Sequence, residues 1–243
     1  MILAIDAGNT QLKMAIFKGN KLQESTVLQY DSTDFDSTLK SWLSKDFNKI
    51  GLVSVKEGAL NKKISSVSKT TVSTVNLNFN FPFKIAYTSP ETLGIDRIVA
   101  CTGAYALNKH QGNLLVIDAG TCITYDVINN EKQYIGGAIS PGINIRRKSL
   151  KDYTAKLPLV KISQRKINTI GKNTNDSITS GIVNGIQYEA QGYMKQIKSS
   201  FPGIKVFLTG GDYFFFEDAL KSSIFAEENL VLIGINELMK TNA

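Results

Sequence analysis

The feature that most constrains this chain is an apolar strand that ends in an aspartate, followed by a turn of small residues. The apolar run 1–5 ends in Asp6, and the turn that follows, Ala-Gly-Asn-Thr, has almost no side-chain bulk. Gly8 lets the backbone approach a ligand closely, and neighbouring N–H groups in such a turn form a concavity that suits phosphate. An extended segment, 11–17, comes next, so the unit is a hairpin and not the strand–loop–helix of a P-loop.

The same unit returns in the second half of the chain. The apolar run 113–117 ends in Asp118, and Ala-Gly-Thr follows, with one residue fewer before the threonine. When Asp6 is aligned with Asp118, Gly8 also aligns with Gly120. Repetition of a whole supersecondary unit bears on architecture. Two such halves facing each other would place two acidic turns across one cleft, which suits a polyphosphate with its cation. The alternative is an ordinary hairpin whose aspartate and threonine cap the turn.

Length and patterning predict how the chain divides. The 243 residues, 42% of them hydrophobic, can bury one large core or two modest ones. The repeat favours two, and we expect an N-terminal domain at 1–108 and a C-terminal domain at 109–243. Strands alternate with helical patterns between the two hairpins, which is typical of an α/β fold.

Charge and composition narrow the class of function. The formal charge of +7, with a pI of about 9.2, agrees with an anionic substrate and would permit loose contact with nucleic acid. The lysines are scattered and form no compact run with interleaved aromatics, so nucleic acid is not the expected partner. No apolar segment resembles a secretory signal or is long enough to span a bilayer, which predicts a soluble, cytoplasmic protein.

The reactive side chains exclude several kinds of catalysis. Cys101 and Cys122 lack metal-ligand spacing and lie in apolar patterns, so we expect free buried thiols. The single histidine, His110, lies in the polar stretch 108–112, and we expect a solvated loop residue. Hydrolase triads and histidine-based metal sites are therefore disfavoured.

The densest chemical stretch is 87–97. Tyr87 ends a short strand, Gly94 permits a sharp turn, and the apolar spacing from 98 to 106 predicts a helix that begins near Asp96 and Arg97. A helix N-terminus keeps Asp96 ionised, so it could accept a proton from an attacking hydroxyl in phosphoryl transfer. Arg97 could bind a carboxylate bidentately. The alternative is that Asp96 caps the helix and Arg97 is a surface cation.

Three further segments are suited to a ligand. The small-residue turn 136–142 could line it, the long helical pattern that starts near 174–177 offers hydroxyls and N–H groups, and the strand 204–208 ends in Thr-Gly-Gly-Asp at 209–212, where an adenosine could lie. The basic segment 143–172 could be a mobile flap or a solvated connection.

The segments 6–10, 94–97, 118–121 and 136–142, with 209–212, together resemble type III pantothenate kinases, a family of the acetate and sugar kinase/Hsp70/actin superfamily. The resemblance runs through the whole chain, in order. It implies two duplicated ribonuclease H-like (actin-like ATPase) domains that face each other across a nucleotide cleft. It also implies ATP-dependent phosphorylation of pantothenate to 4′-phosphopantothenate, the first step of coenzyme A biosynthesis. The family works as a homodimer, with Mg²⁺ for ATP and K⁺ or NH₄⁺ as a monovalent cation.

The resemblance assigns roles to individual residues. The nucleotide-phosphate loop falls on the first hairpin and a second ATP contact on the second: Asp6, Ala7, Gly8, Asn9, Thr10, Gln11, Leu12 and Lys13, with Thr121. The substrate contacts, with Asp96 as general base, fall on Tyr87, Gly94, Ile95, Asp96, Arg97 and Thr174. The monovalent-cation ligand falls on Asp118.

Two departures and two alternatives remain at this stage. The segment 90–93 reads Pro-Glu-Thr-Leu, which departs from the family pattern, and the chain is short for the family. The resemblance therefore does not define the details of the pantothenate pocket around this segment. Some relatives are transcriptional regulators, although a regulator need not keep Asp96, Arg97 and both acidic turns. Another small-molecule kinase of the superfamily is the other alternative.

Overall fold

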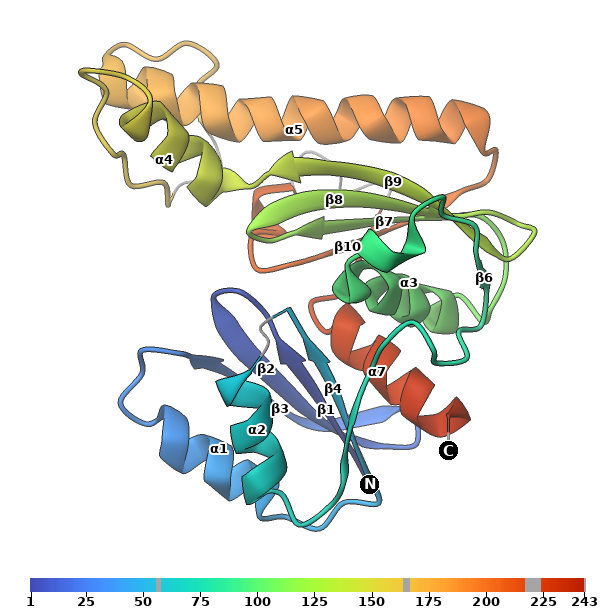
Figure 1. Ribbon diagram of the computed structural model, residues 1–243. Coiled ribbons are helices and arrows are strands. Elements are labelled where there is room, and N and C mark those ends of the chain that lie inside the picture. Colours follow the sequence, from blue (N-terminus) through green and yellow to red (C-terminus); the bar gives the residue numbers. More distant parts are fainter. Residues whose placement is uncertain (56–57, 164–166, 217–223, 243) are drawn as a thin grey trace. The chain divides into compact units, whose positions relative to one another are not determined.

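The structure is a computed structural model and describes residues 1–55, 58–163, 167–216 and 224–242 (Figure 1). The described chain forms two compact units, each with its own β-sheet. The first unit contains Met1–Gln111, Lys132–Tyr134 and the segment that starts at Asn229. The second contains Gly112–Glu131 and Ile135–Glu228.

The first unit is built on a five-stranded sheet in the order β3-β2-β1-β4-β5. The strands are β1 (Ile2–Ala7), β2 (Gln11–Lys18), β3 (Lys21–Gln29), β4 (Lys49–Ser54) and β5 (Val72–Thr74). The first three form an antiparallel meander, whereas β4 runs parallel to β1 and to β5. A short strand, β6 (Lys84–Ile85), pairs in parallel with Gln133 and Tyr134 of the same unit.

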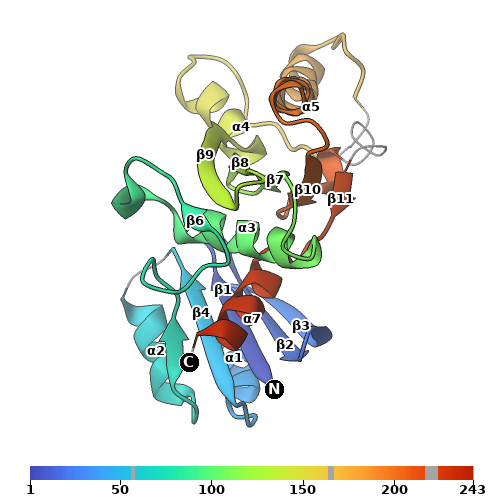
Figure 2. The same ribbon diagram turned by 90° about the vertical axis from the view of Figure 1, so that its right-hand side faces the viewer.

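Helices cover both faces of this first sheet. The helices α1 (Phe35–Leu43) and α2 (Ala59–Val67) bury Leu39, Trp42 and Ile64 against one face. The helix α7 (Leu230–Thr241) packs on the other face, where Ile235 and Met239 lie against Gly51 of β4. Figure 2 shows α1 and α7 on opposite sides of the strands. The predicted core position of Trp42 is confirmed, at 6% exposure.

The helix α3 (Ile95–Leu107) also belongs to the first unit and crosses α7 at very short range. The crossing is made through two glycines: Gly103 lies against the backbone of Leu230, and Gly234 lies against the backbone of Val99. A side chain at either position would overlap with main-chain atoms of the other helix. Glycine is therefore required here for close approach.

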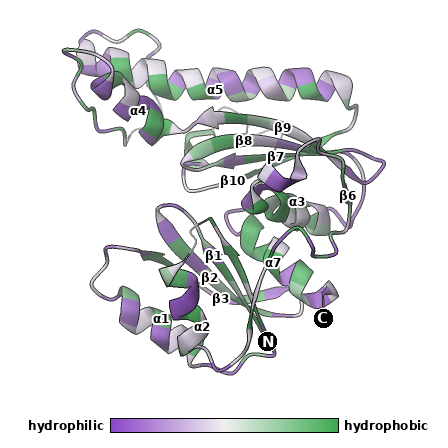
Figure 3. Ribbon diagram, in the orientation of Figure 1, coloured by the Kyte–Doolittle hydropathy of each residue, from purple (hydrophilic) through white to green (hydrophobic). Residues whose placement is uncertain are grey.

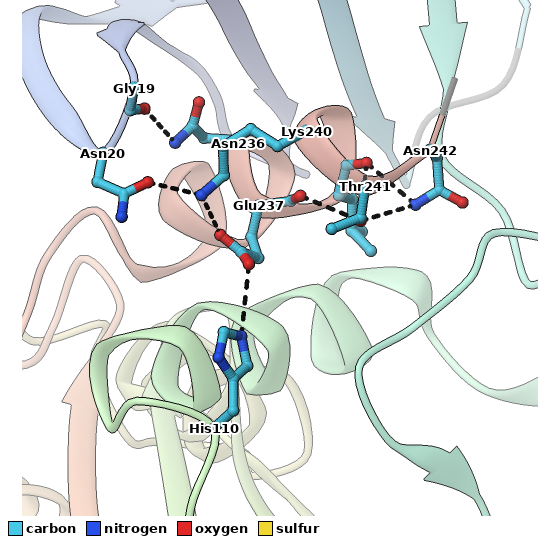
Figure 4. Close-up of polar contacts among 9 residues, drawn as sticks. Gly19, Asn20, His110, Asn236, Glu237, Lys240, Thr241 and Asn242 are labelled. Carbon is cyan, nitrogen blue, oxygen red and sulfur yellow. Dashed lines mark hydrogen bonds and ion pairs between the residues drawn. The ribbon is translucent and has the colours of Figure 1, made fainter.

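Polar contacts fix the position of α7 within the first unit (Figure 4). The Asn236 amide donates to the carbonyl of Gly19 at 3.0 Å, and Lys240 donates to the side chain of Asn20 at 2.6 Å. His110 Nε2 lies 3.4 Å from a carboxylate oxygen of Glu237, which also pairs with Lys240. His110 lies in a turn and is exposed, as expected, although the carboxylate of α7 and the ring of Tyr105 flank its side chain.

The second unit repeats the strand hairpin and adds a long helix. Its strands are β7 (Leu114–Ala119), β8 (Cys122–Ile128), the part of β9 (Gln133–Pro141) from Ile135 onward, β10 (Lys205–Thr209) and β11 (Ile224–Ala226), in the order β11-β10-β7-β8-β9. The helix α5 (Thr174–Ser200) packs its apolar stripe, including Ile178, Ile182 and Ile186, on this sheet. The helix α4 (Ile143–Asp152) contacts α5. Figure 3 shows hydrophobic strands and an α5 whose polar and apolar residues alternate.

The observed units differ from the expected division at 1–108 and 109–243 in the helix α7. This helix follows the second unit in sequence but packs with α3, β1 and β4 of the first. The contacts are steric and apolar: the glycine pair allows the close crossing with α3, and Ile235 and Met239 lie against Gly51 of the first sheet. None of the helices in the described part of the chain has the length and apolar character needed to cross a membrane. Cys101 is buried, as expected, whereas Cys122 is only partly buried, contrary to expectation.

Candidate active site

The first acid-tipped turn lies between β1 and β2. Ala7 pairs with Leu12 across the hairpin, and the Gly8 N–H donates to the carbonyl of Gln11 at 3.1 Å, which closes the turn. The Tyr30 hydroxyl at the end of β3 donates to the carbonyl of Gly8 at 2.8 Å. Sequence reasoning missed this tyrosine, which fixes the loop from outside the motif.

The Asp6 carboxylate has an unusual electrostatic environment. Asp6 and Lys13 are directly opposite each other in the β1–β2 ladder, so their side chains lie on the same face of the sheet. Burial raises the pKa of Asp6 from 3.8 to about 6; the Lys13 charge opposes this shift and the charge of Asp96 adds to it. Asp6, Lys13 and Asp96 therefore form one electrostatic cluster within the first unit, although Asp96 is distant from the other two in sequence.

The cluster includes the start of α3, where the sequence predicts the general base. Gly94 is the N-cap of this helix, and Asp96 is its second residue. The Asp96 carboxylate accepts a hydrogen bond of 3.0 Å from the Arg97 N–H and occupies the space that a Cβ on Gly94 would need. Asp96 is thus not the cap itself. The Arg97 N–H and the N-terminal end of the helix dipole thus both lie at this carboxylate.

The remaining predicted substrate contacts of the first unit lie next to this helix start. Arg97 is 7% exposed, so the alternative of a surface cation is wrong. Ile95 begins α3. The partly buried Tyr87 follows β6, and its ring lies 6.0 Å from that of Tyr134.

The second acid-tipped turn has the same register as the first. Ala119 pairs with Ile123 and Asp118 with Thr124, and the Gly120 N–H donates to the carbonyl of Cys122 at 2.9 Å. The burial of β7 and β8 also follows that of β1 and β2, with the aspartate and its opposite residue partly buried between buried neighbours. The repeat seen in the sequence is therefore a structural repeat.

Two neighbouring segments support the Asp118 turn within the second unit: the end of β9 with Gly142, where the sequence predicted a turn at 136–142 but the structure has a strand as far as Pro141, and the turn that follows β10. The Gly142 N–H donates to the carbonyl of Thr121 at 3.0 Å, and a Cβ at Gly142 would overlap with the backbone of this turn. On the β10 side, the Asp212 N–H donates to the carbonyl of Ala119 at 2.8 Å. Gly210, with φ of +96°, lies directly on Ala119. The segments 136–142 and 209–212 thus meet at this strand end.

A polar network that sequence reasoning missed holds the end of β9. Arg146 of α4 donates to the carbonyl of Pro141 at 2.7 Å and to the hydroxyl of Ser140 at 2.8 Å, and it pairs with Glu189 of α5. Glu189 also accepts hydrogen bonds from Ser140 and from Tyr125 of β8, both at 2.9 Å. No sequence motif signals this network, because its members are contributed by four separate elements.

Thr174, the last predicted substrate contact, is the first residue of α5 and is exposed. The Asn173 side chain caps the helix by accepting from the Asp176 N–H at 2.9 Å. The structure thus places Thr174 at a helix N-terminus, as expected. It brings Asp6, Lys13 and Asp96 together in the first unit, and Asp118 and Thr121 together in the second.

Comparison with solved structures identifies the class of this fold. A ROK family glucokinase from Streptomyces griseus, solved with glucose and AMPPNP, aligns with a TM-score of 0.57 over 98% of each chain, at 10% identity. The activator of 2-hydroxyisocaproyl-CoA dehydratase from Clostridium difficile, solved with bound ADPNP, aligns with a TM-score of 0.55 over 98% of this chain and 96% of that one, at 11% identity. The fold is that of the actin-like ATPases, two related α/β domains, as predicted.

Sequence comparison then gives the family. The family model described as type III pantothenate kinase matches residues 2–196. A type III pantothenate kinase from Christiangramia forsetii is 42% identical over 248 residues, which cover 100% of this chain and 99% of the relative. One from Flavobacterium johnsoniae is 39% identical over 239 residues, 98% of this chain and 96% of the relative. This chain belongs to the type III pantothenate kinase family.

Proposed function

We propose that this chain transfers the γ-phosphoryl group of ATP to the hydroxyl group of pantothenate, with Asp96 as the general base. The product is 4′-phosphopantothenate, and the reaction is the first step of coenzyme A biosynthesis. Family membership supports the activity. The observation that supports the assignment of the base is that Asp96 lies close enough to Asp6, at the start of the predicted nucleotide loop, for its charge to raise the pKa of Asp6.

The proposed roles follow from the chemistry of phosphoryl transfer, which depends on positioning and charge neutralisation. Asp96 takes the proton of the attacking hydroxyl, and its ionised form is favoured at the start of α3. Arg97 holds the carboxylate of pantothenate, with Tyr87, Gly94, Ile95 and Thr174 as further substrate contacts. The loop 6–13 binds the phosphates of ATP through its backbone N–H groups and Lys13, and Thr121 makes a further ATP contact.

The residues present also fit the cations that the family uses. We propose that Mg²⁺ binds mainly through the nucleotide phosphates near Asp6, as Mg²⁺ commonly does in kinases. A monovalent cation, K⁺ or NH₄⁺, would be held at Asp118. When bound, these ions neutralise charge on the triphosphate. We also propose that the enzyme is a homodimer in the cytoplasm, which sedimentation and cell fractionation would test.

The decisive experiment replaces the proposed base. Asp96→Asn keeps the size of the side chain and removes the proton acceptor, so we expect kcat to fall by roughly 10²-fold or more while the Kd for ATP changes little. Asp36 is the matched control, because it is the second residue of α1 as Asp96 is of α3, and it is exposed. Asp36→Asn should leave kcat unchanged.

The measurement is a coupled assay for ADP with ATP, Mg²⁺, K⁺ and pantothenate, together with detection of 4′-phosphopantothenate. Turnover of Asp96→Asn near the wild-type rate would show that Asp96 is not the base. Phosphorylation of acetate or a sugar by the wild-type protein, without phosphorylation of pantothenate, would reject the substrate assignment itself.

A further inference from the structure

The two hairpins differ at one functionally important position. In the first, the residue opposite the strand-end aspartate is Lys13; in the second, the residue opposite Asp118 is Thr124. Residues directly opposite each other in an antiparallel pair have Cβ atoms about 4.5–5.5 Å apart and project on the same face. The duplication thus provides an internal comparison, in which the same scaffold has a lysine in one copy and a threonine in the other.

The lysine provides a fixed positive charge beside its aspartate. Its ammonium group acts on Asp6 electrostatically and opposes the effect of burial on this carboxylate. A lysine ammonium is a compact point charge with three donors, and it is equivalent to an ammonium ion tethered to the chain. The first hairpin therefore contributes one positive charge of its own to the nucleotide loop.

The threonine leaves an unsatisfied oxygen at the equivalent position. Thr124 Oγ1 is buried and, within the described part of the chain, has no hydrogen-bond partner. A buried hydroxyl without a partner is uncommon and calls for an explanation such as a bound ion or water. The hydroxyl oxygen has two lone pairs, and carboxylate and hydroxyl oxygens are ligands that can replace the hydration shell of K⁺ or accept hydrogen bonds from NH₄⁺.

We propose that Thr124 Oγ1 is a ligand, together with Asp118, of the monovalent cation, and that this cation replaces in the second hairpin the ammonium group that Lys13 provides in the first. The proposal rests on the proposed function, because the cation is useful only where a polyphosphate binds. It also explains the charge of the ion: an untethered equivalent of a lysine side chain carries a single positive charge.

Three variants of Thr124 test this role. Thr124→Val keeps the shape and removes the oxygen, Thr124→Ser keeps the oxygen, and Thr124→Lys introduces the residue of the first hairpin. Thr26→Val is the matched control, because Thr26 is also a partly buried threonine on a strand, in β3 of the first unit. The first readout is the Tm of the protein in KCl against choline chloride at equal ionic strength. The second is the K⁺ concentration that gives half-maximal phosphorylation of pantothenate.

We expect wild type, Thr124→Ser and Thr26→Val to be stabilised and activated by K⁺. Thr124→Val should need about tenfold more K⁺ in both readouts, because loss of one interaction at a metal site typically costs about 10- to 100-fold in affinity. Thr124→Lys should be active without K⁺ and show no K⁺-dependent change in Tm. If Thr124→Lys does not fold, the K⁺ dependence of Thr124→Val and Thr124→Ser in the two readouts still tests the role of the Thr124 hydroxyl.

Wild-type K⁺ half-saturation for Thr124→Val in both readouts would overturn the proposal. A folded Thr124→Lys protein that still requires K⁺ would overturn it as well. Failure of the proposed function gives a different result: wild type would then phosphorylate no pantothenate, while the response of Tm to K⁺ could still be compared among the variants.

Discussion

At the scale of single residues, the shifted pKa of Asp6 makes the stability of the folded protein depend on pH. Its folded-state pKa of about 6 lies above the ordinary value of 3.8, because burial outweighs the attraction of Lys13. A raised carboxyl pKa means that the folded protein holds a proton that the unfolded chain has already released between these two pH values. With respect to Asp6, the folded state is therefore most stable below about pH 4, where the carboxyl is protonated in both states. This advantage is lost as the pH rises through 6.

This shift predicts a pH-dependent effect of removing the charge. In the ligand-free protein, Asp6→Asn should raise the free energy of unfolding by up to about 3 kcal/mol at pH 7.5 and by little at pH 4, since two pKa units correspond to about 3 kcal/mol. Urea unfolding at pH values from 4 to 7.5 measures it, with Asp36→Asn as a control for the substitution. An Asp6→Asn effect that does not vary with pH would contradict the assigned environment.

At the scale of structural elements, the end of β9 and Gly142 connect the helices α4 and α5 to the candidate cation and ATP site. Arg146 and Glu189 hold Ser140 and Pro141, and the next residue, Gly142, donates directly to the carbonyl of Thr121. The residues 140–142 thus link α4 and α5 to the Asp118 turn through a short chain of hydrogen bonds.

A methyl group at this junction should disturb ATP binding. Gly142→Ala introduces a Cβ that overlaps with the backbone of Gly120 and Thr121, so the turn must move. We expect a loss of about 1–3 kcal/mol of stability and a higher KM for ATP. Gly181→Ala on α5 is the control, because a Cβ there meets nothing within 4 Å and alanine favours the helix. Equal KM values for ATP in Gly142→Ala and wild type would argue against this link.

The elements also show what the sequence could and could not predict. The two hairpins and their strand-end aspartates were predictable because each motif is local in sequence and because the second copy repeats the first. The helix start at Asp96 was predictable from apolar spacing. The opposition of Asp118 and Thr124 required the register of the hairpin, and the contact of Tyr30 with Gly8 required the return of β3. The Arg146–Glu189 pair required the packing of α4 on α5.

At the scale of the whole molecule, the helix α7 completes the unit that contains the proposed base. It crosses α3, the helix that begins with Asp96, at the Gly103–Gly234 contact, and Lys49 of β4 donates to its last carbonyls, those of Met239 and Asn242, at 2.7 and 2.9 Å. The contact between these two glycines was not predictable from the sequence, because a glycine does not identify its partner.

This crossing predicts that a small change far from the site will impair it. Gly103→Ala forces a methyl group into the backbone of Leu230, so α3 and α7 must separate. We expect a loss of about 2 kcal/mol or more of stability, with a fall in kcat because the start of α3 moves with the helix. Thermal unfolding and the ADP assay measure both. Gly192→Ala, where a Cβ meets nothing within 4 Å, should change neither.

The place of α7 in the first unit has a consequence for the synthesis and folding of the protein itself. Asp6, Lys13 and Asp96 leave the ribosome early, yet the sheet face and the glycine contact that support them stay uncovered until residues 230–241 have been made. A nascent chain must therefore keep an apolar surface open throughout translation of the second unit. Chains from truncated messages would carry the proposed base and the nucleotide loop, but they would expose this surface and become substrates for chaperones or proteases.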